Sequence, residues 1–243
     1  MTSLTTPEKL FAVIYEDDEL LVINKPAGLV CHPTKTDEYS SLISRVRLYL
    51  GKESPAHLVN RLDRETSGVT VVAKRDDAAR ELRRLWENRL VEKEYAAIVC
   101  GWVREESGRI DAPLGKDESS RVAVKDCVRA DGLPSQTEFS VENRFSRAEG
   151  DFTLLRIRLL TGRKHQIRIH LAHIGHPIAG DKLYGGDEDL YLALVEDRLT
   201  NEQRRRLIFR NQALHARALR FAWRSEAKEF CCEPESCFQD FLQ

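Results

Sequence analysis

Short apolar runs recur along this chain, and some segments alternate between apolar and polar residues, and both patterns are typical of strands. Phe11 to Tyr15 and Leu20 to Ile23 indicate two short strands around an acidic turn, and Val69 to Ala73 indicates a buried strand. Tyr95 to Val99 also indicates a strand, with Tyr95, Ala97 and Val99 on one face, and Phe152 to Leu160 is the clearest strand of the chain. The pattern therefore predicts a protein in which strands predominate.

Other segments follow the helical period of apolar residues. We expect helices from Ser41 to Leu50, from Asp76 as N-cap to about Asn88, and from about Lys164 to Ile174. From about 108 to 147, Pro, Gly and alternating residues predict short antiparallel strands. Pro26 and Gly28 lie two apart, which predicts a tight turn with a positive φ at Gly28.

Neither an internal repeat nor a low-complexity linker interrupts these elements, so the pattern predicts one α+β (mixed α/β) domain. The 243 residues are 42% hydrophobic and 32% charged, without a long apolar run, which excludes a disordered chain and a membrane protein. The first residues resemble no export signal, so we expect a cytoplasmic location. The six cysteines form no C-x-x-C pair, and we expect reduced thiols rather than a zinc site.

Charge is balanced overall but segregated along the chain. Lys and Arg number 38 against 39 Asp and Glu, a net charge of −1. Residues 152–180 contain no acidic residue, yet they hold five Lys and Arg and four histidines. Such a stretch can form a basic face for a polyanion, and it can equally be a solvated strand and helix face.

The loop around Asp63 has the residues of a reactive carboxylate. Asp63 lies between Arg61 and Arg64, whose positive field keeps a carboxylate ionised, as a nucleophile or base requires. Thr66 and the two residues after it add hydroxyls and exposed backbone, which suit a phosphate or a tight turn. A loop stabilised only by Asp–Arg pairs is the alternative reading.

A second cluster precedes and opens the helix expected near residue 164. Gly162 leads into a first turn that we expect to hold Arg163, Lys164, His165 and Gln166, and helix N-termini favour phosphate. The histidines at 165, 170, 173 and 176 lack a nearby acidic ligand and the usual helical ligand spacing, so we expect no metal.

Five stretches resemble, in order, the RluA-like family of RNA pseudouridine synthases. NRLDRETSG (60–68) resembles the catalytic signature, and TGRKHQIRIHLAHIGHPIAGDKLYG (161–185) resembles the later conserved block. EDDELLVINKPAGLVCHP (16–33), EKEYAAIV (92–99) and LHARALRF (214–221) complete the series. Asn60 departs from the family, which usually has His there, so a role for a protonated imidazole is lost. The chain resembles the form without the additional N-terminal RNA-binding domain.

The resemblance implies an isomerase that converts uridine in tRNA or rRNA to pseudouridine. Asp63 is the expected essential carboxylate, acting at C1′ of the uridine either as nucleophile or through a glycal. Arg168 matches the basic residue that pairs with this aspartate, with Arg163 as second choice, and Tyr95 matches the tyrosine that stacks on the base. Arg61 is expected to fill the space of the flipped nucleotide. The full set expected to bind RNA is Arg61, Arg64, Thr66, Arg163, Lys164, His165 and Gln166.

The same resemblance implies a single catalytic domain with a central, largely antiparallel sheet flanked by helices. We expect this domain over 15–225, an N-terminal extension over 1–14 and an acidic tail over 226–243. Residues 187–210 fit no family pattern and are interpreted as a surface insertion with a helix around Asn201 to Phe209. The arginines at 204–206 either touch RNA or form a solvated face. We expect a monomer that needs no cofactor or metal and binds neither DNA nor a membrane.

Two other functions fit parts of the sequence. A glycosidic-bond hydrolase usually needs two carboxylates, and Glu65 is the only second acid near Asp63 in the loop. A non-catalytic RNA-binding module or RNA chaperone would keep the basic residues. It would not need Asp63, Tyr95 and an arginine in the family order, so the sequence favours the enzyme.

Overall fold

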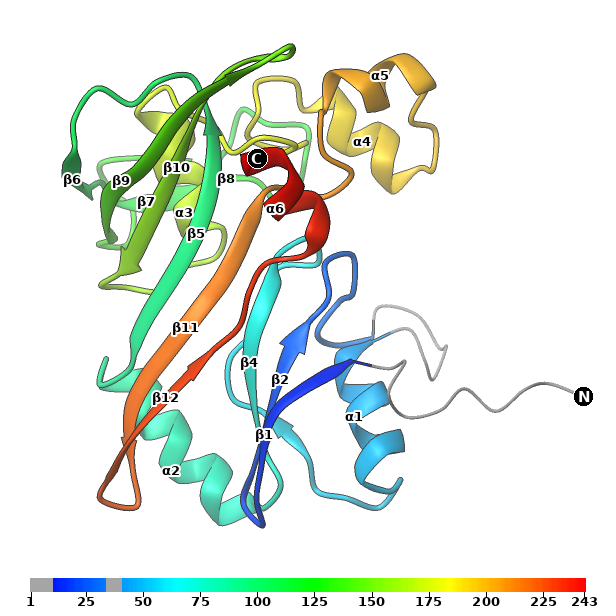
Figure 1. Ribbon diagram of the computed structural model, residues 1–243, viewed down its shortest axis with the longest axis vertical. Helices are drawn as coiled ribbons and strands as arrows, with labels where there is room; N and C mark the ends of the chain where they lie inside the picture. Colours follow the sequence, from blue (N-terminus) through cyan, green and yellow to red (C-terminus); the bar gives the residue numbers. More distant parts are fainter. Residues whose placement is uncertain (1–10, 34–40) are drawn as a thin grey trace, which may run out of the picture. The chain divides into compact units, whose positions relative to one another are not determined.

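The computed structural model describes residues 11–33 and 41–243, so the first ten residues of the expected N-terminal extension lie outside the described residues. The chain divides into two compact units, residues 1–93 with 215–236 and residues 94–214 with 237–243. Figure 1 labels their helices and strands. No helix in the described ranges is long and apolar enough to cross a bilayer.

The first unit combines a mainly antiparallel sheet with two helices. Its elements are β1 (Ala12–Glu16), β2 (Leu20–Lys25), α1 (Leu42–Leu50), β3 (His57–Leu58), β4 (Ser67–Ala73), α2 (Asp76–Glu87), β11 (Leu214–Trp223) and β12 (Glu226–Cys231). Strand β2 pairs antiparallel with both β1 and β4. Strand β11 pairs in parallel with the start of β4 and antiparallel with β12.

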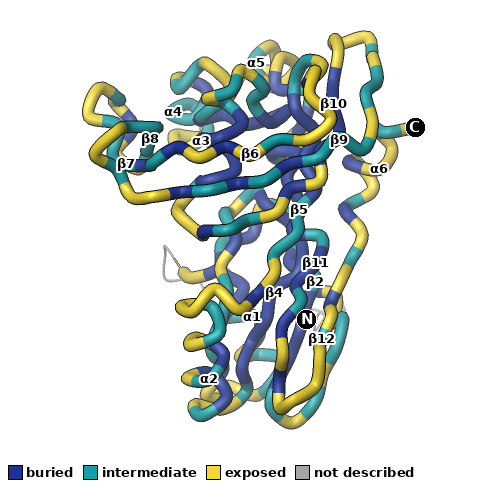
Figure 2. The backbone as a smooth tube through the Cα atoms, turned by 90° about the vertical axis from the view of Figure 1, so that its left-hand side faces the viewer, coloured by how far each residue is buried: buried dark blue, intermediate teal, exposed yellow. Residues whose placement is uncertain are grey.

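Alternation along β2 explains why helices cover this sheet. Leu20 and Val22 pack in the hydrophobic cluster that includes Leu82 of α2. Their neighbours Leu21 and Ile23 pack in a second cluster with residues of α1. Strand β4 contributes to both clusters, and all of its residues are buried (Figure 2). Because successive strand residues point to opposite faces, the sheet buries both faces.

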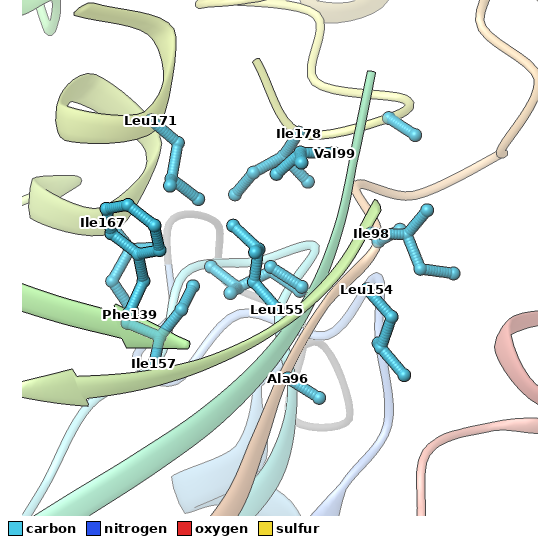
Figure 3. Close-up of a cluster of buried hydrophobic side chains, with 14 of the residues drawn as sticks. Ala96, Ile98, Val99, Phe139, Leu154, Leu155, Ile157, Ile167, Leu171 and Ile178 are labelled. Carbon is cyan, nitrogen blue, oxygen red and sulfur yellow. The ribbon is translucent and has the colours of Figure 1, made fainter. Parts of the chain in front are cut away.

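The second unit is a longer antiparallel sheet with short helices. Its elements are β5 (Glu92–Cys100), β6 (Ser107–Asp111), β7 (Leu114–Lys116), β8 (Asp126–Val128), β9 (Gln136–Arg147), β10 (Gly150–Leu159), α3 (Gln166–His173), α4 (Asp189–Val195), α5 (Asn201–Arg206) and α6 (Ser236–Leu242). The sheet order is β5-β10-β9-β6, and β7 pairs separately with β8. Figure 3 shows its core, where Leu155 and Ile157 of β10 and Ile167 and Leu171 of α3 belong to one cluster.

The expected α+β class with a largely antiparallel sheet flanked by helices is confirmed. The positive φ predicted for Gly28 in the turn after Pro26 is also confirmed, at 85°. Two expectations about helix starts are wrong. Asp76 is the first residue of α2 and Arg75 occupies the N-cap position, while α3 begins at Gln166 rather than Lys164 because His165 is left-handed, with a φ of 55°.

Three further segments differ from the expected elements. Between residues 107 and 128 the expected short antiparallel strands are present as β6, β7 and β8, but the following strand β9 has 12 residues. Helix α5 ends at Arg206, and Leu207 beyond it is buried with Leu190 and Leu199 in a small core within the insertion. The segment expected as an acidic tail contains β12 and α6.

Candidate active site

Asp63 lies in the first unit, in the loop that joins β3 to β4. The loop turns at this residue, where the Thr66 amide donates to the Asp63 carbonyl at 3.2 Å. Asp63 is half-buried, and Arg61 and Arg64 on either side of Leu62 and Asp63 are exposed. The expected run of a carboxylate between arginines therefore forms a tight loop at the end of a buried strand.

Asn60 fixes the start of this loop to strand β4. Its amide nitrogen donates to the Val69 carbonyl at 3.1 Å, and its carbonyl oxygen accepts from the Val71 amide at 2.8 Å. The two bonds use both ends of one planar amide, which supplies a donor and an acceptor side by side. The residue that departs from the family pattern thus holds the loop without a titratable ring.

Cys31 and Lys25 hold the residues on each side of Asp63. The Cys31 thiol lies 3.3 Å from the Leu62 carbonyl and 3.4 Å from the Leu62 amide. The Lys25 ammonium donates to the carbonyls of Leu29 at 2.8 Å and Arg64 at 3.2 Å, and to that of the next residue in the chain at 2.9 Å. Burial lowers the pKa of Lys25 to about 8, although nearby negative charges, including that of Asp63, act to raise it. The Asp63 loop is therefore anchored through its backbone.

The residues after the loop are buried, whereas the sequence predicted hydroxyls and exposed backbone there that suit a phosphate or a tight turn. Thr66 is only 2% exposed, so its hydroxyl offers no surface to a phosphate. Gly68 has a φ of 120°, and a Cβ at this position would lie 2.2 Å from the Ala216 carbonyl oxygen. The Ser67 hydroxyl lies 2.9 Å from Nδ1 of His215, which is itself buried. This segment packs β4 against β11.

Arg168 lies in the second unit and forms a buried ion pair. Its Nε and Nη2 donate to the two carboxylate oxygens of Asp181 at 2.7 and 2.9 Å. Burial acts to raise the pKa of Asp181, but Arg168 and backbone N–H groups outweigh it and lower the pKa below its usual value. The guanidinium also lies 5.0 Å from the ring centre of Tyr184. Arg168 is therefore fixed in the interior of its unit.

Gln166 ties the turn before α3 to strand β9. Its side-chain oxygen accepts from the Thr161 hydroxyl at 2.8 Å and the Arg163 amide at 3.0 Å. Its nitrogen donates to the Gln136 carbonyl and the Thr137 hydroxyl, both at 2.9 Å. Gln166 is 2% exposed, so its side chain is structural and offers no surface to RNA.

The three residues before Gln166 precede α3 rather than form its first turn. Lys164 pairs with Asp126 at 2.8 Å, and Nδ1 of His165 lies 2.9 Å from the Tyr184 hydroxyl. Arg163 is exposed and has no ion-pair partner among the described residues. The cations that were expected on the first helical turn belong to the loop before it.

Tyr95 and His170 also lie in the second unit, on β5 and α3. Tyr95 of β5 is half-buried, opposite Ile157 of β10 in the strand register, and packs against the hydrophobic core. His170 is buried between the Thr137 hydroxyl at 2.8 Å and the Ala112 carbonyl at 2.9 Å, and burial lowers its pKa. The described part of the chain holds no group of three or more side chains suited to a metal ion.

Residues 19–173 match the family described as RNA pseudouridylate synthase, and the chain belongs to that family. It is 36% identical over 228 residues to the ribosomal large subunit pseudouridine synthase D of Pasteurella multocida, covering 89% of this chain and 64% of that one. The protein of the same name from Xanthomonas campestris is 42% identical over 212 residues, with 86% and 61% covered.

The structure is similar to human RNA pseudouridylate synthase domain containing 1, with a TM-score of 0.74, 26% identity, and 97% of this chain and 90% of that chain covered. The chain spans 61–64% of the length of the two bacterial relatives. The resemblance found in the sequence motifs is thereby confirmed at the level of the family.

Proposed function

We propose that this chain isomerises uridine to pseudouridine in RNA, with Asp63 as the essential carboxylate. The observation that carries the proposal is the anchored loop within a chain of this family. Asn60, Cys31 and Lys25 hold the backbone next to Asp63, while the carboxylate itself sits at a half-buried position. A loop with no chemical task would not need its backbone held from β4, from Cys31 and from a buried ammonium.

The reaction breaks the bond between C1′ and N1 of uridine and joins C1′ to C5 of the same base. Asp63 either adds to C1′ or promotes loss of the 2′ proton to give a glycal. The released uracil rotates, C5 bonds to C1′, and the C5 proton leaves while N1 gains a proton. Atoms and electrons balance within the base and sugar, so the isomerisation consumes no co-reactant.

Arg168 and Tyr95 are proposed to act with Asp63, in the roles that the resemblance implies. An arginine that serves a carboxylate works best when its own geometry is fixed in advance. The bidentate contact with Asp181 supplies that restraint in the interior of the second unit. Tyr95 is proposed to stack on the base, since aromatic faces receive unstacked nucleobases.

The proposed substrate is large-subunit ribosomal RNA, because the bacterial relatives carry that substrate in their names. Arg61, Arg64, Arg163 and Lys164 are exposed and are proposed to contact its phosphates. A transfer RNA is the second substrate to test. We propose that the chain acts in the cytoplasm as a monomer, as the sequence predicts.

The experiment starts from ribosomal and transfer RNA of cells that lack the gene. The full chain and its Asp63→Asn variant are added separately, and pseudouridines are mapped at nucleotide resolution. The proposal predicts one or a few sites in large-subunit RNA that only the wild type restores. Restoration by Asp63→Asn would contradict the role of the carboxylate, and restoration in neither RNA by a chain that binds RNA would favour a binding module.

A further inference from the structure

A cavity of about 480 Å³ lies in the second unit, between the β7–β8 hairpin and the turn that precedes α3. Its volume lies within the range of about 300–1,000 Å³ that is typical of sites for small molecules. Cations predominate among its charged side chains, which are Lys116, Arg129, Arg163, Lys164, Asp126 and Asp131. The hairpin carries none of the candidate catalytic residues Asp63, Tyr95 and Arg168, whereas Arg163 and Lys164 of the cavity belong to the candidate RNA-binding set.

The cavity has an uncompensated positive charge. Asp126 pairs with Lys164 at 2.8 Å, and Asp131 pairs with Arg129 at 2.5 Å. Among the described residues, the other two cations, Lys116 and Arg163, have no carboxylate partner. Lys116 instead donates to backbone carbonyls of the hairpin, including that of Lys125 at 3.5 Å. Two positive charges thus face a space with no anion of the chain to neutralise them.

Contacts outside the cavity hold the hairpin in place. Glu188, just before α4, accepts from the Ser120 hydroxyl at 2.7 Å and pairs with Lys125 at 3.1 Å. The hydrogen bond from Ser120, and after it that from Lys125, lowers the pKa of Glu188 to about 2. The Asp126 amide donates to the Tyr184 hydroxyl at 3.3 Å. The insertion that fits no family pattern therefore supports the hairpin, so the cavity is formed before any ligand arrives.

Glycine also shapes the wall. A Cβ on Gly132 would lie 2.6 Å from the backbone of Leu114, so only glycine allows the two segments to approach. Leu133 next to it is 58% exposed and lines the same cavity. The site thus combines unpaired cations, bare backbone and one exposed apolar side chain, which together suit a phosphate attached to a sugar and base.

We propose that this cavity binds a phosphodiester group of the substrate RNA, at a nucleotide other than the uridine that is isomerised. The inference rests on the proposed function and extends it by naming a second contact with the substrate. Lys116 and Arg163 hold the phosphate, and Leu133 contacts the attached sugar or base. RNA is favoured over a free anion for two reasons. Arg163, which lines the cavity, is exposed, and the exposed apolar side chain of Leu133 can contact a sugar or base but would gain nothing from an inorganic ion.

Charge at one position provides the sharpest test. Leu133→Glu places a carboxylate at the cavity, and Leu133→Gln introduces a neutral side chain of similar size at the same exposed position. Arg163→Gln removes one of the unpaired cations. Arg104→Gln is the matched control, since Arg104 is exposed in the same unit and does not line the cavity.

The probe is an unmodified transcript of large-subunit ribosomal RNA, with kcat and KM measured from about 0.05 to 0.3 M salt, where phosphate contacts dominate the salt dependence. Loss of one contact lowers the salt slope by about 0.7 and the affinity about fourfold near 0.15 M salt. We expect KM to rise about fourfold in Arg163→Gln, and to rise more in Leu133→Glu than in Leu133→Gln. We expect kcat to stay within about twofold in the two Leu133 variants and Arg104→Gln to match the wild type.

Equal KM and equal salt slope in Arg163→Gln, Leu133→Glu and Arg104→Gln would overturn the proposal. Saturable binding of inorganic phosphate that Arg163→Gln abolishes, with the KM for RNA unchanged, would assign the cavity to a small anion and would also overturn it. If the wild type forms no pseudouridine in any RNA, the proposed function fails instead. In that case, binding of the same transcript still tests the cavity, because the salt slope does not depend on turnover.

Discussion

Asp181→Asn tests how firmly the fold fixes Arg168. The change is nearly isosteric and keeps an oxygen that can accept from the Leu183 and Tyr184 amides, which now donate to Asp181 at 2.9 and 3.0 Å. It removes the negative charge that faces the guanidinium at 2.7 and 2.9 Å. The effect therefore reports the loss of the charge together with the loss of the acceptor for Nε of Arg168.

The magnitude follows from burial. The side chain of Asp181 is 0% exposed and that of Arg168 is 9% exposed. Removing one partner of a buried pair typically costs about 3–5 kcal/mol, because the other charge stays desolvated. We expect about 3 kcal/mol, the lower end, since the Tyr184 ring also faces the guanidinium. That is a large part of the roughly 5–15 kcal/mol by which domains are stable.

The assay is urea unfolding followed by circular dichroism, with Asp126→Asn as control. Asp126 pairs with Lys164, whose side chain is 50% exposed, so we expect a loss of about 0–1 kcal/mol there. The double variant Asp181→Asn with Arg168→Met should recover most of the loss, because neither charge remains. Equal, small losses in Asp181→Asn and Asp126→Asn would refute the reasoning.

The ion pair of Arg168 with Asp181 also makes the free energy of unfolding depend on pH. The pKa of Asp181 is lowered in the folded chain, so its contribution is present above the unfolded value of about 3.9 and is lost as the pH falls through the lower folded value. Asp181→Asn should therefore flatten the acid side of the stability curve. A curve with the same acid slope in both proteins would contradict the assignment.

Three further outcomes can be checked. Asn60→Ala should lower the free energy of unfolding by about 1–3 kcal/mol, because it leaves the Val71 amide without its acceptor, and urea unfolding measures this. The Lys25 side chain should titrate near pH 8 by NMR. Because its ordinary value is 10.5, its contribution to unfolding free energy should rise from about pH 8 upward, whereas titration near 10.5 would contradict the buried ammonium. Tyr95→Phe should keep RNA affinity within about twofold if stacking is its role, and a large loss of binding would contradict that role.

Local pattern was enough to predict most elements of the sheet. Leu20 to Ile23 is apolar throughout and Val69 to Ala73 is apolar except for Thr70, and both are buried strands whose faces meet α1 and α2. Pro26 followed by Gly28 predicted the turn because only a few residues decide its geometry. Strand periodicity and turn chemistry are properties of neighbouring residues, so a single sequence is sufficient for them.

The contacts that shape the site are not local, and pattern could not give them. The burial of Thr66 and Ser67 depends on β11, and His215 lies 148 residues beyond Ser67. The buried ion pair of Arg168 is formed with Asp181, 13 residues later, and no local pattern predicts that pairing. The start of α3 depends on the left-handed backbone of His165, which no propensity for that residue predicts.

The most direct test of the central claim follows the C5 proton and the base together. RNA labelled with tritium at C5 of uridine is incubated with the wild type, Asp63→Asn and Glu65→Gln, and the products are separated. The account predicts tritium release and RNA-bound pseudouridine from the wild type and Glu65→Gln, and neither from Asp63→Asn. Free uracil as the product, or loss of turnover in Glu65→Gln equal to that in Asp63→Asn, would indicate hydrolysis by two carboxylates and contradict the account.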